Sequence, residues 1–161
     1  MLVINHLATG KGASLPGRIL PIIRNMSYEE MLQAVNNTCD VHVDDTVTLP
    51  SDTLTGVYDE TLKTILIDQR MTDVQKRCTL THELIHWTHG DQGCGTQIGR
   101  QAEHRTQQET AKTLINPIAY QQAEQECDAD PYQIACQLDV TLSVVNTYRE
   151  MLRSGVIPGI C

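Results

Sequence analysis

The clearest hydrophobic pattern in the chain has the period of a β-strand. Across residues 40–49 the apolar side chains stand at odd positions with mostly polar residues between them: Val41, Val43, Val47 and Leu49. Alternation of this kind predicts a strand with one buried face. Two further strand-like runs, 55–58 and 63–68, flank Asp59-Glu60, which predicts a hairpin turn. The pattern therefore predicts a small sheet of two or three strands.

The segment before this sheet has no clear period at first. Residues 1–26 contain scattered glycines and prolines, and we expect them to form a poorly ordered or wrapping arm. Ser27 followed by Glu30 is a capping box, the sequence signature of a helix start. Apolar residues with helical spacing follow, so a helix is predicted from there to about Asn36 or Asn37.

The last third of the chain has the spacing of two short helices. Residues 131–138 and 142–153 are predicted to be helical and to be joined by a turn at 139–141. This arrangement resembles a helix-turn-helix core, whose second helix would present its polar side chains to DNA bases. Those side chains are Asn146, Arg149 and Arg153. Because several acidic residues surround them, we interpret the segment as a structural helical pair, with DNA reading as the alternative.

The composition restricts the classes of protein to which the chain can belong. Twelve basic and 20 acidic side chains give a formal net charge of −8. This charge argues against direct nucleic-acid binding, which depends on basic contacts to phosphates. No run approaches the roughly 18 apolar residues of a membrane helix, and the N-terminus lacks the features of a signal peptide. We therefore expect a cytoplasmic protein without a membrane partner, whose six scattered cysteines are free thiols.

Residues 81–87 contain the pattern His-Glu-x-x-His inside a predicted helix. The signals that bound this helix are Thr72, Gln75 and Gly90. Four residues along an α-helix correspond to about 400° of rotation and roughly 6 Å of rise, so His82 and His86 share one face. Glu83 lies beside the position that a water would occupy on a bound zinc ion. The pattern predicts metal-assisted amide hydrolysis, and the alternative is two ordinary histidines on a helix.

A catalytic zinc site needs a third protein ligand. The downstream candidates are Asp91, Glu103, His104, Glu109, Glu124 and Glu126. The glycine-rich segment 90–99 predicts a loop that reverses the chain into a second helix over about 99–115. Glu109 would lie about 9 Å beyond Glu103 along that helix, so the two cannot both bind the metal. Spacing favours Glu103 and leaves Glu109 and His104 open.

The chain resembles the ImmA/IrrE-type metallopeptidases in several stretches. Residues 77–91 resemble that family's metal-binding helix and the turn after it. Residues 103–115 resemble its second signature, in which a glutamate opens a helix and a pair of apolar residues closes it. Residues 56–58 and 65–68 resemble the strands before the metal helix. The likeness covers about residues 27–153.

The resemblance implies a third ligand, a fold and a class of substrate. The family's ligand glutamate falls on Glu103. We expect an α+β fold in which a small sheet packs on a mostly helical zincin-like core, residues 27–120. An arm, 1–26, would precede this core, and a helical extension, 121–161, would pack on it. Members of this family are intracellular, and several cleave helix-turn-helix repressors of mobile elements or stress-response genes, which implies a protein substrate of that kind.

The chain departs from the family's pattern shortly after the ligand glutamate. The family often has an Ala-Asp pair there, and this chain has Thr106 and Gln107. An acidic group at that place would orient a ligand histidine through a hydrogen bond. Gln107 can accept such a bond through its amide oxygen but carries no charge.

The expected mechanism gives Glu83 the role of general base, which takes a proton from the zinc-activated water and passes it to the departing nitrogen. His89, His104 and Tyr120 are candidates for stabilising the oxyanion, beside an ordinary packing or surface role for each. One strand of the sheet is expected to pair with the substrate backbone. The alternatives to an enzyme are a non-catalytic repressor-binding protein and a DNA-binding regulator that uses the C-terminal segment.

Overall fold

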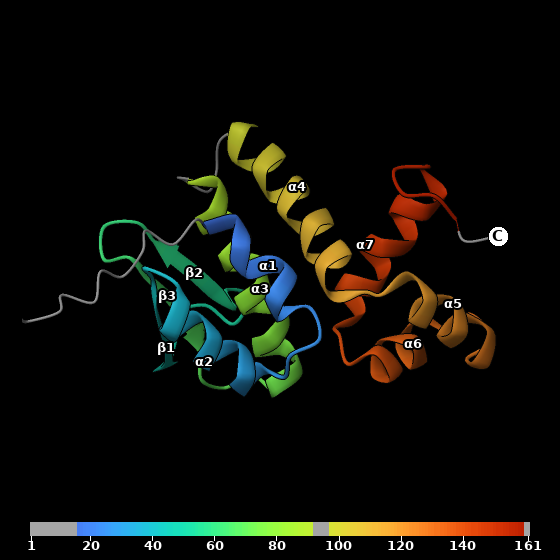
Figure 1. Ribbon diagram of the computed structural model, residues 1–161, viewed down its shortest axis with the longest axis horizontal. Helices are drawn as coiled ribbons and strands as arrows, with labels where there is room; N and C mark the ends of the chain where they lie inside the picture. Colours follow the sequence, from blue (N-terminus) through green and yellow to red (C-terminus); the bar gives the residue numbers. More distant parts are fainter. Residues whose placement is uncertain (1–15, 92–96, 160–161) are drawn as a thin grey trace, which may run out of the picture.

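The computed structural model describes residues 16–91 and 97–159 and has an α+β fold (Figure 1). Its strands are β1 (His42–Val47), β2 (Gly56–Asp59) and β3 (Thr64–Asp68). Its helices are the 3-10 turn η1 (Pro16–Arg18), α1 (Ile19–Ile23), α2 (Tyr28–Thr38), α3 (Asp73–His89), α4 (Gln97–Leu114), α5 (Pro117–Glu126), α6 (Pro131–Leu138) and α7 (Leu142–Arg153). The predicted α+β class is confirmed. In the described part of the chain no helix has the length and apolar character to cross a bilayer.

The three strands form one mixed sheet in the order β1-β3-β2. β2 and β3 are antiparallel neighbours, as the predicted hairpin requires, and β1 runs parallel to β3. The central strand, β3, carries the most deeply buried residues of the sheet: Ile65 and Ile67 are both 0% exposed. β1 and β2 are the two edges of the sheet.

The alternating pattern over residues 41–49 holds except at one position. Val41, Val43 and Leu49 are buried as predicted, but Val47 is only half-buried. The register against β3 shifts between Asp44 and Val47, where three residues of β1 advance against two of β3. One extra residue in a strand reverses which face the following side chains occupy. The bulge therefore explains the exposure of Val47.

Helix α3 lies between two hydrophobic clusters. It begins and ends as predicted: the side chains of Thr72 and Gln75 form the capping box, and Gly90 has the left-handed conformation that closes a helix. One cluster, which we call the sheet cluster, joins residues of α1, α2 and the strands to Leu80, Leu84 and Trp87 of α3. The other, the C-terminal cluster, joins residues of α4 to α7 with Cys78 of the same helix.

The C-terminal region contains three helices where a pair is predicted. The boundaries of α6 and α7 are those predicted, but α5 precedes them. Asn116 accepts hydrogen bonds from the first backbone N–H groups of α5, and Pro117 occupies its first position. An asparagine before a proline is a helix start as well as a stop. The preceding helix is predicted to end at about residue 115, but no helix start is predicted at Asn116.

The described part of the predicted N-terminal arm packs on the core. Residues 1–15 lie outside the described ranges. From Pro16 onward the chain forms η1 and α1, and Ile19 and Ile23 of α1 are buried in the sheet cluster. Their spacing of four residues places both on one helix face. Burial of this face stabilises the short helix, although it contains Pro21.

Arg77, near the start of α3, connects three segments that are distant in sequence. Its guanidinium donates hydrogen bonds to the carbonyl oxygens of Arg24 and Met26 in the N-terminal segment. It also donates to the carbonyl oxygen of Asp139, in the turn between α6 and α7. Arg77 is only 7% exposed, so these bonds lie in a region with little access for water. They fix the N-terminal segment and the turn between α6 and α7 to the helix that carries the His-Glu-x-x-His pattern.

Candidate metal centre

The two histidines predicted to bind metal lie together with Glu103. The Nε2 atoms of His82 and His86 are 3.1 Å apart. Of the two carboxylate oxygens of Glu103, on α4, Oε1 lies 3.3 Å from His82 Nε2 and Oε2 lies 3.3 Å from His86 Nε2. Across residues 16–91 and 97–159, these three form the one group of potential ligands whose donor atoms all lie within 4.8 Å of one another.

The donor groups of these three side chains, which we call the triangle, are spaced as the ligands of a small divalent ion are. Zinc bonds of about 2.0–2.1 Å at tetrahedral angles place neighbouring ligand atoms about 3.3 Å apart. The observed separations are 3.1 to 3.3 Å. Two imidazoles and one carboxylate are also a ligand set found in catalytic zinc sites. The group therefore can hold a metal ion.

The charges at this triangle suit a cation. Hydrogen bonds from His82 and then His86 hold the pKa of Glu103 well below its usual range, although partial burial acts in the opposite direction. Burial would lower the pKa of His86, but hydrogen bonds to Glu103 and Asp91 raise it overall. Both shifts express the attraction between imidazole protons and carboxylates. A metal ion would replace those protons.

Glu83 is the most buried acid of the site. It is 8% exposed and follows His82 on α3. Burial raises its pKa above the ordinary value, while His82 and His86 act in the opposite direction. A carboxylate next to two imidazoles is placed to accept a proton and to return it, as a general base must.

Strand β2 approaches α3 closely at Glu83. A Cβ atom on Gly56 would lie 2.4 Å from the side chain of Thr79 and 3.3 Å from Cγ of Glu83. Only glycine permits this approach, because any other residue would displace one of the two helix side chains. The sequence analysis did not single out Gly56. Its position at the start of a predicted strand was a signal for a close backbone contact.

An acid orients His86, and it is not at the position that the resemblance implied. The Nδ1 atom of His86 lies 3.0 Å from Oδ2 of Asp91. Arg105 of α4 donates a hydrogen bond to the same oxygen of Asp91, and the Oγ1 atom of Thr106 lies 3.4 Å from His86 Nδ1. A carboxylate bonded to the far nitrogen of a ligand imidazole fixes its orientation and increases its basicity. Asp91 therefore takes the role considered for residue 107.

Gln107 lies at the site but contacts a different ligand. Its amide nitrogen donates a hydrogen bond of 3.0 Å to Oε1 of Glu103. Glu109, the alternative third ligand, lies away from the triangle, with Oε2 2.9 Å from His89 Nε2. The pairing of His89 with Glu109 gives both residues a partner outside the site.

The other two candidates for oxyanion stabilisation also lie elsewhere. His104 is on the exposed side of α4, next to Glu103 in sequence but away from the cleft. Tyr120 is buried in the C-terminal cluster, where its hydroxyl donates to Glu124 and its ring packs on Tyr148. Neither side chain lines the cleft that contains the three ligands.

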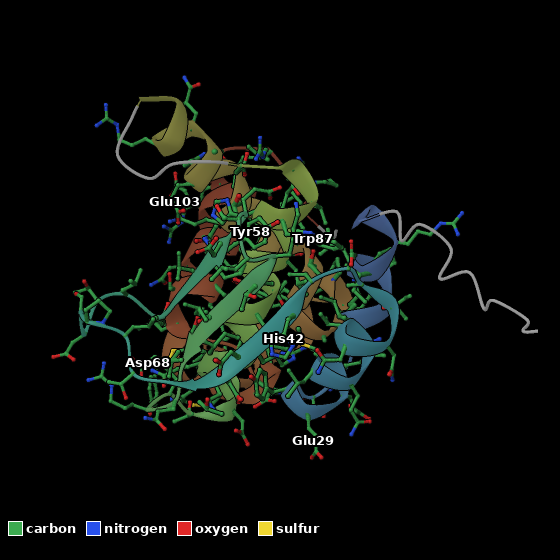
Figure 2. All side chains as sticks on the ribbon, turned by 90° about the vertical axis from the view of Figure 1, so that its left-hand side faces the viewer. Glu29, His42, Tyr58, Asp68, Trp87 and Glu103 are labelled. Carbon is green, nitrogen blue, oxygen red and sulfur yellow. The ribbon has the colours of Figure 1, made fainter. Side chains whose placement is uncertain are left out.

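The ligands open into a cleft of about 950 Å³. Of the two edge strands, β2 lines this cleft through residues 56–58, together with faces of α3, α4 and α7. Figure 2 shows Glu103 of α4 and Tyr58 of β2 at the same end of the molecule, with Asp68 toward the other end. The site is therefore bounded by an edge strand on one side and by helices on the others.

Comparison of the chain with protein-family models, with curated proteins and with solved structures gives no match. The site must therefore be interpreted from its own geometry. That geometry defines a group that can hold a metal ion, with a buried carboxylate beside it and a cleft above it.

Proposed function

We propose that the protein is a zinc-dependent endopeptidase with a zincin-like core. The observation that carries the proposal is the triangle of His82 Nε2, His86 Nε2 and the Glu103 carboxylate, with Glu83 buried next to it. A site that only held a metal for structural purposes would have no use for a second carboxylate that does not bind the metal. Glu83 supplies the proton acceptor that hydrolysis needs.

Each residue has a distinct role in the proposed reaction. His82, His86 and Glu103 would hold zinc, which acidifies a water and polarises a carbonyl when bound. Glu83 takes the proton of the attacking water and returns it to the leaving nitrogen. Asp91 keeps the His86 imidazole in the tautomer that presents Nε2 to the metal.

The edge strand suggests how a peptide binds. β2 pairs with β3 on one side only, and its residues 56–58 line the cleft on the other. An extended peptide that added itself to this edge would gain main-chain hydrogen bonds irrespective of its sequence. It would then cross the triangle of ligands. Such binding favours a substrate segment that is unfolded or exposed when it is cut.

The proposed substrate is a helix-turn-helix transcriptional repressor of a mobile element or stress response, and the proposed compartment is the cytoplasm. Both follow from the likeness of residues 77–91 and 103–115 to the ImmA/IrrE-type peptidases. The charge of −8 is compatible with a basic protein partner.

The decisive experiment incubates the zinc-loaded protein with the repressor encoded beside its gene and measures the masses of the products. We expect one clean cut that a chelator prevents and that added zinc restores. The matched control is Glu83→Gln, which should bind zinc in the same ratio and leave the repressor intact. Cutting by Glu83→Gln at the wild-type rate would contradict the proposal.

The alternatives receive less support from the geometry. A non-catalytic repressor-binding protein has no need for Glu83. A DNA-binding regulator would need the polar side chains of α7 for DNA, yet Arg149 donates a hydrogen bond to the carbonyl oxygen of Ala129. The N-terminal half of α7 also lines the cleft through Ser143, Val144 and Thr147. A gel shift on operator DNA at low salt would test the regulator directly.

A further inference from the structure

The cleft extends past the three ligands to a second region with different chemistry. At that end it is lined by Cys78, Thr110, Thr141, Val144 and Thr147, which we call the α7 pocket. We infer that the α7 pocket binds an uncharged, apolar side chain of the substrate next to the bond that is cut. This inference rests on the proposed peptidase function and specifies its substrate.

The distance from the metal to the α7 pocket suits a neighbouring side chain. Cys78 precedes His82 by four residues on α3, about 6 Å along the axis. Thr110 follows Glu103 by seven residues on α4, about 10 Å along the axis. Both steps lead to the same end of the cleft, since Cys78 packs in one cluster with Val144 and with Ala111, the neighbour of Thr110. A side chain attached beside the reacting carbonyl spans a distance of this order.

Helix α7 closes this end of the cleft. It packs against α4, and Val144 and Thr147, three residues apart, lie on one face of it. Cys78, Thr110 and Val144 are 6%, 3% and 8% exposed, so they form the back of the wall, and the half-buried Thr141 and Thr147 present more of their surface to the cleft. The C-terminal helices therefore contribute directly to the cleft.

The polar groups of the wall are largely occupied within the protein. The hydroxyl of Thr110 donates a hydrogen bond of 2.8 Å to the carbonyl oxygen of Thr106, which leaves its methyl group for a ligand. The thiol of Cys78 interacts with Thr141, and burial raises the pKa of this thiol. Val144 is apolar. A ligand side chain would meet only uncharged groups here.

Charge separates the two ends of the cleft. All the charged side chains among its described lining residues lie at the metal or beyond it: Glu83, Asp91, Arg100 and Glu103. The five residues of the α7 pocket carry no charge. An ionised substrate side chain would lose its hydration there without gaining a partner, whereas burial of an aliphatic one is favourable.

The edge strand explains how a single side chain enters. Side chains of an extended peptide alternate between its two faces, so one beside the cut bond points toward the helices while its neighbours point away. The α7 pocket would therefore select one position of the substrate. The rest of the segment would bind mainly through its backbone to β2.

The test measures the affinity of zinc-loaded protein for short peptide hydroxamates, which bind zinc through the hydroxamate group. Three probes differ only in the adjacent side chain: isobutyl, carboxyethyl or aminobutyl. We expect the isobutyl probe to bind about tenfold or more tightly than either charged probe, measured by calorimetry. Equal affinities of the three probes would contradict the proposed selectivity of the α7 pocket, while their binding would still support the zinc site. Failure of all three to bind would overturn the zinc site on which the inference rests.

A charge introduced into the pocket sharpens the test. Thr147→Glu should raise the affinity for the aminobutyl probe about tenfold relative to the isobutyl probe, because the new carboxylate supplies the missing partner. The matched control is Asn146→Glu, which adds the same charge to an exposed neighbouring position outside the cleft. The control should keep the wild-type order of affinities. The same shift in both variants would overturn the inference, since it would reflect net charge alone.

Discussion

The two helices that form the candidate metal site build it in different ways. α3 contributes His82, Glu83 and His86 within five residues, on a helix that packs against both hydrophobic clusters. α4 contributes Glu103, whose side chain is 43% exposed and which reaches the site after a reversal of the chain. The α3 side is set by helical periodicity and the α4 side by docking of one helix on another. Loss of docking would therefore remove one ligand and leave two.

The largest effect is expected from removing one ligand from each side. His82→Ala and Glu103→Ala should both abolish cleavage. Each should weaken zinc binding by more than the about 10–100-fold that loss of an outer partner costs. Zinc affinity measured by chelator competition checks this. The matched control is Glu109→Ala, on the same helix but paired with His89 outside the triangle. If Glu109→Ala lost as much zinc affinity as Glu103→Ala, the assignment of Glu103 as the third ligand would be wrong.

The next effect concerns the proton acceptor of the α3 side. Glu83→Gln should lower the cleavage rate by about 10²–10⁴-fold, because the amide cannot accept the proton of the attacking water. Its zinc content should stay at one ion per chain, since Glu83 is not a ligand. Cleavage rate and elemental analysis on the same preparation separate the two roles. Loss of zinc from Glu83→Gln would indicate that Glu83 binds the metal and is not the general base.

A smaller effect is expected from Arg77, which joins the N-terminal segment and the turn between α6 and α7 to α3. Arg77→Met should lower the free energy of unfolding by about 3 kcal/mol, because three backbone carbonyls lose a buried charged donor. Urea unfolding should be followed without zinc, since bound metal would add its own stabilisation. Arg24→Met is the control: this exposed arginine also donates to two carbonyls, and about 1 kcal/mol or less is expected. Equal losses would mean that burial of Arg77 contributes nothing.

The smallest effect should come from the acid behind His86. Asp91→Asn should reduce zinc affinity about 10–100-fold, because the amide orients the imidazole without increasing its basicity. Glu109→Gln is a matched control, since it changes an equivalent carboxylate–imidazole pair of 2.9 Å that does not involve a ligand. Zinc affinity and its pH dependence are the measurements. An Asp91→Asn protein with wild-type affinity would leave His86 oriented by Thr106 alone.

The α3 side of the site was predictable in full. The period of an α-helix, the capping box at Thr72 and the stop at Gly90 depend on residues within a few positions of one another. Such local signals determine where a helix lies and which side chains share a face. The boundaries of α6 and α7 were predictable for the same reason. Residues 92–96, in the predicted glycine-rich loop, lie outside the described ranges.

The α4 side was predictable only in outline. Helical spacing excluded that Glu103 and Glu109 both bind the metal, but the choice between them depends on how α4 docks against α3. The third ligand is set by a contact between residues 17 or more apart in sequence, such as His86 and Glu103. The same is true of Asp91, which returns to His86 only because Gly90 turns the chain left-handed.

By itself, the sequence determined the helix that carries His82, Glu83 and His86, the hairpin, and the α+β class, because each follows from backbone periodicity and local capping. The tertiary structure decided which acid completes the triangle, which strand lines the cleft, and that α7 closes its far end. Those features arise from packing between elements distant in the chain, and the pattern of one element does not specify the surface of another.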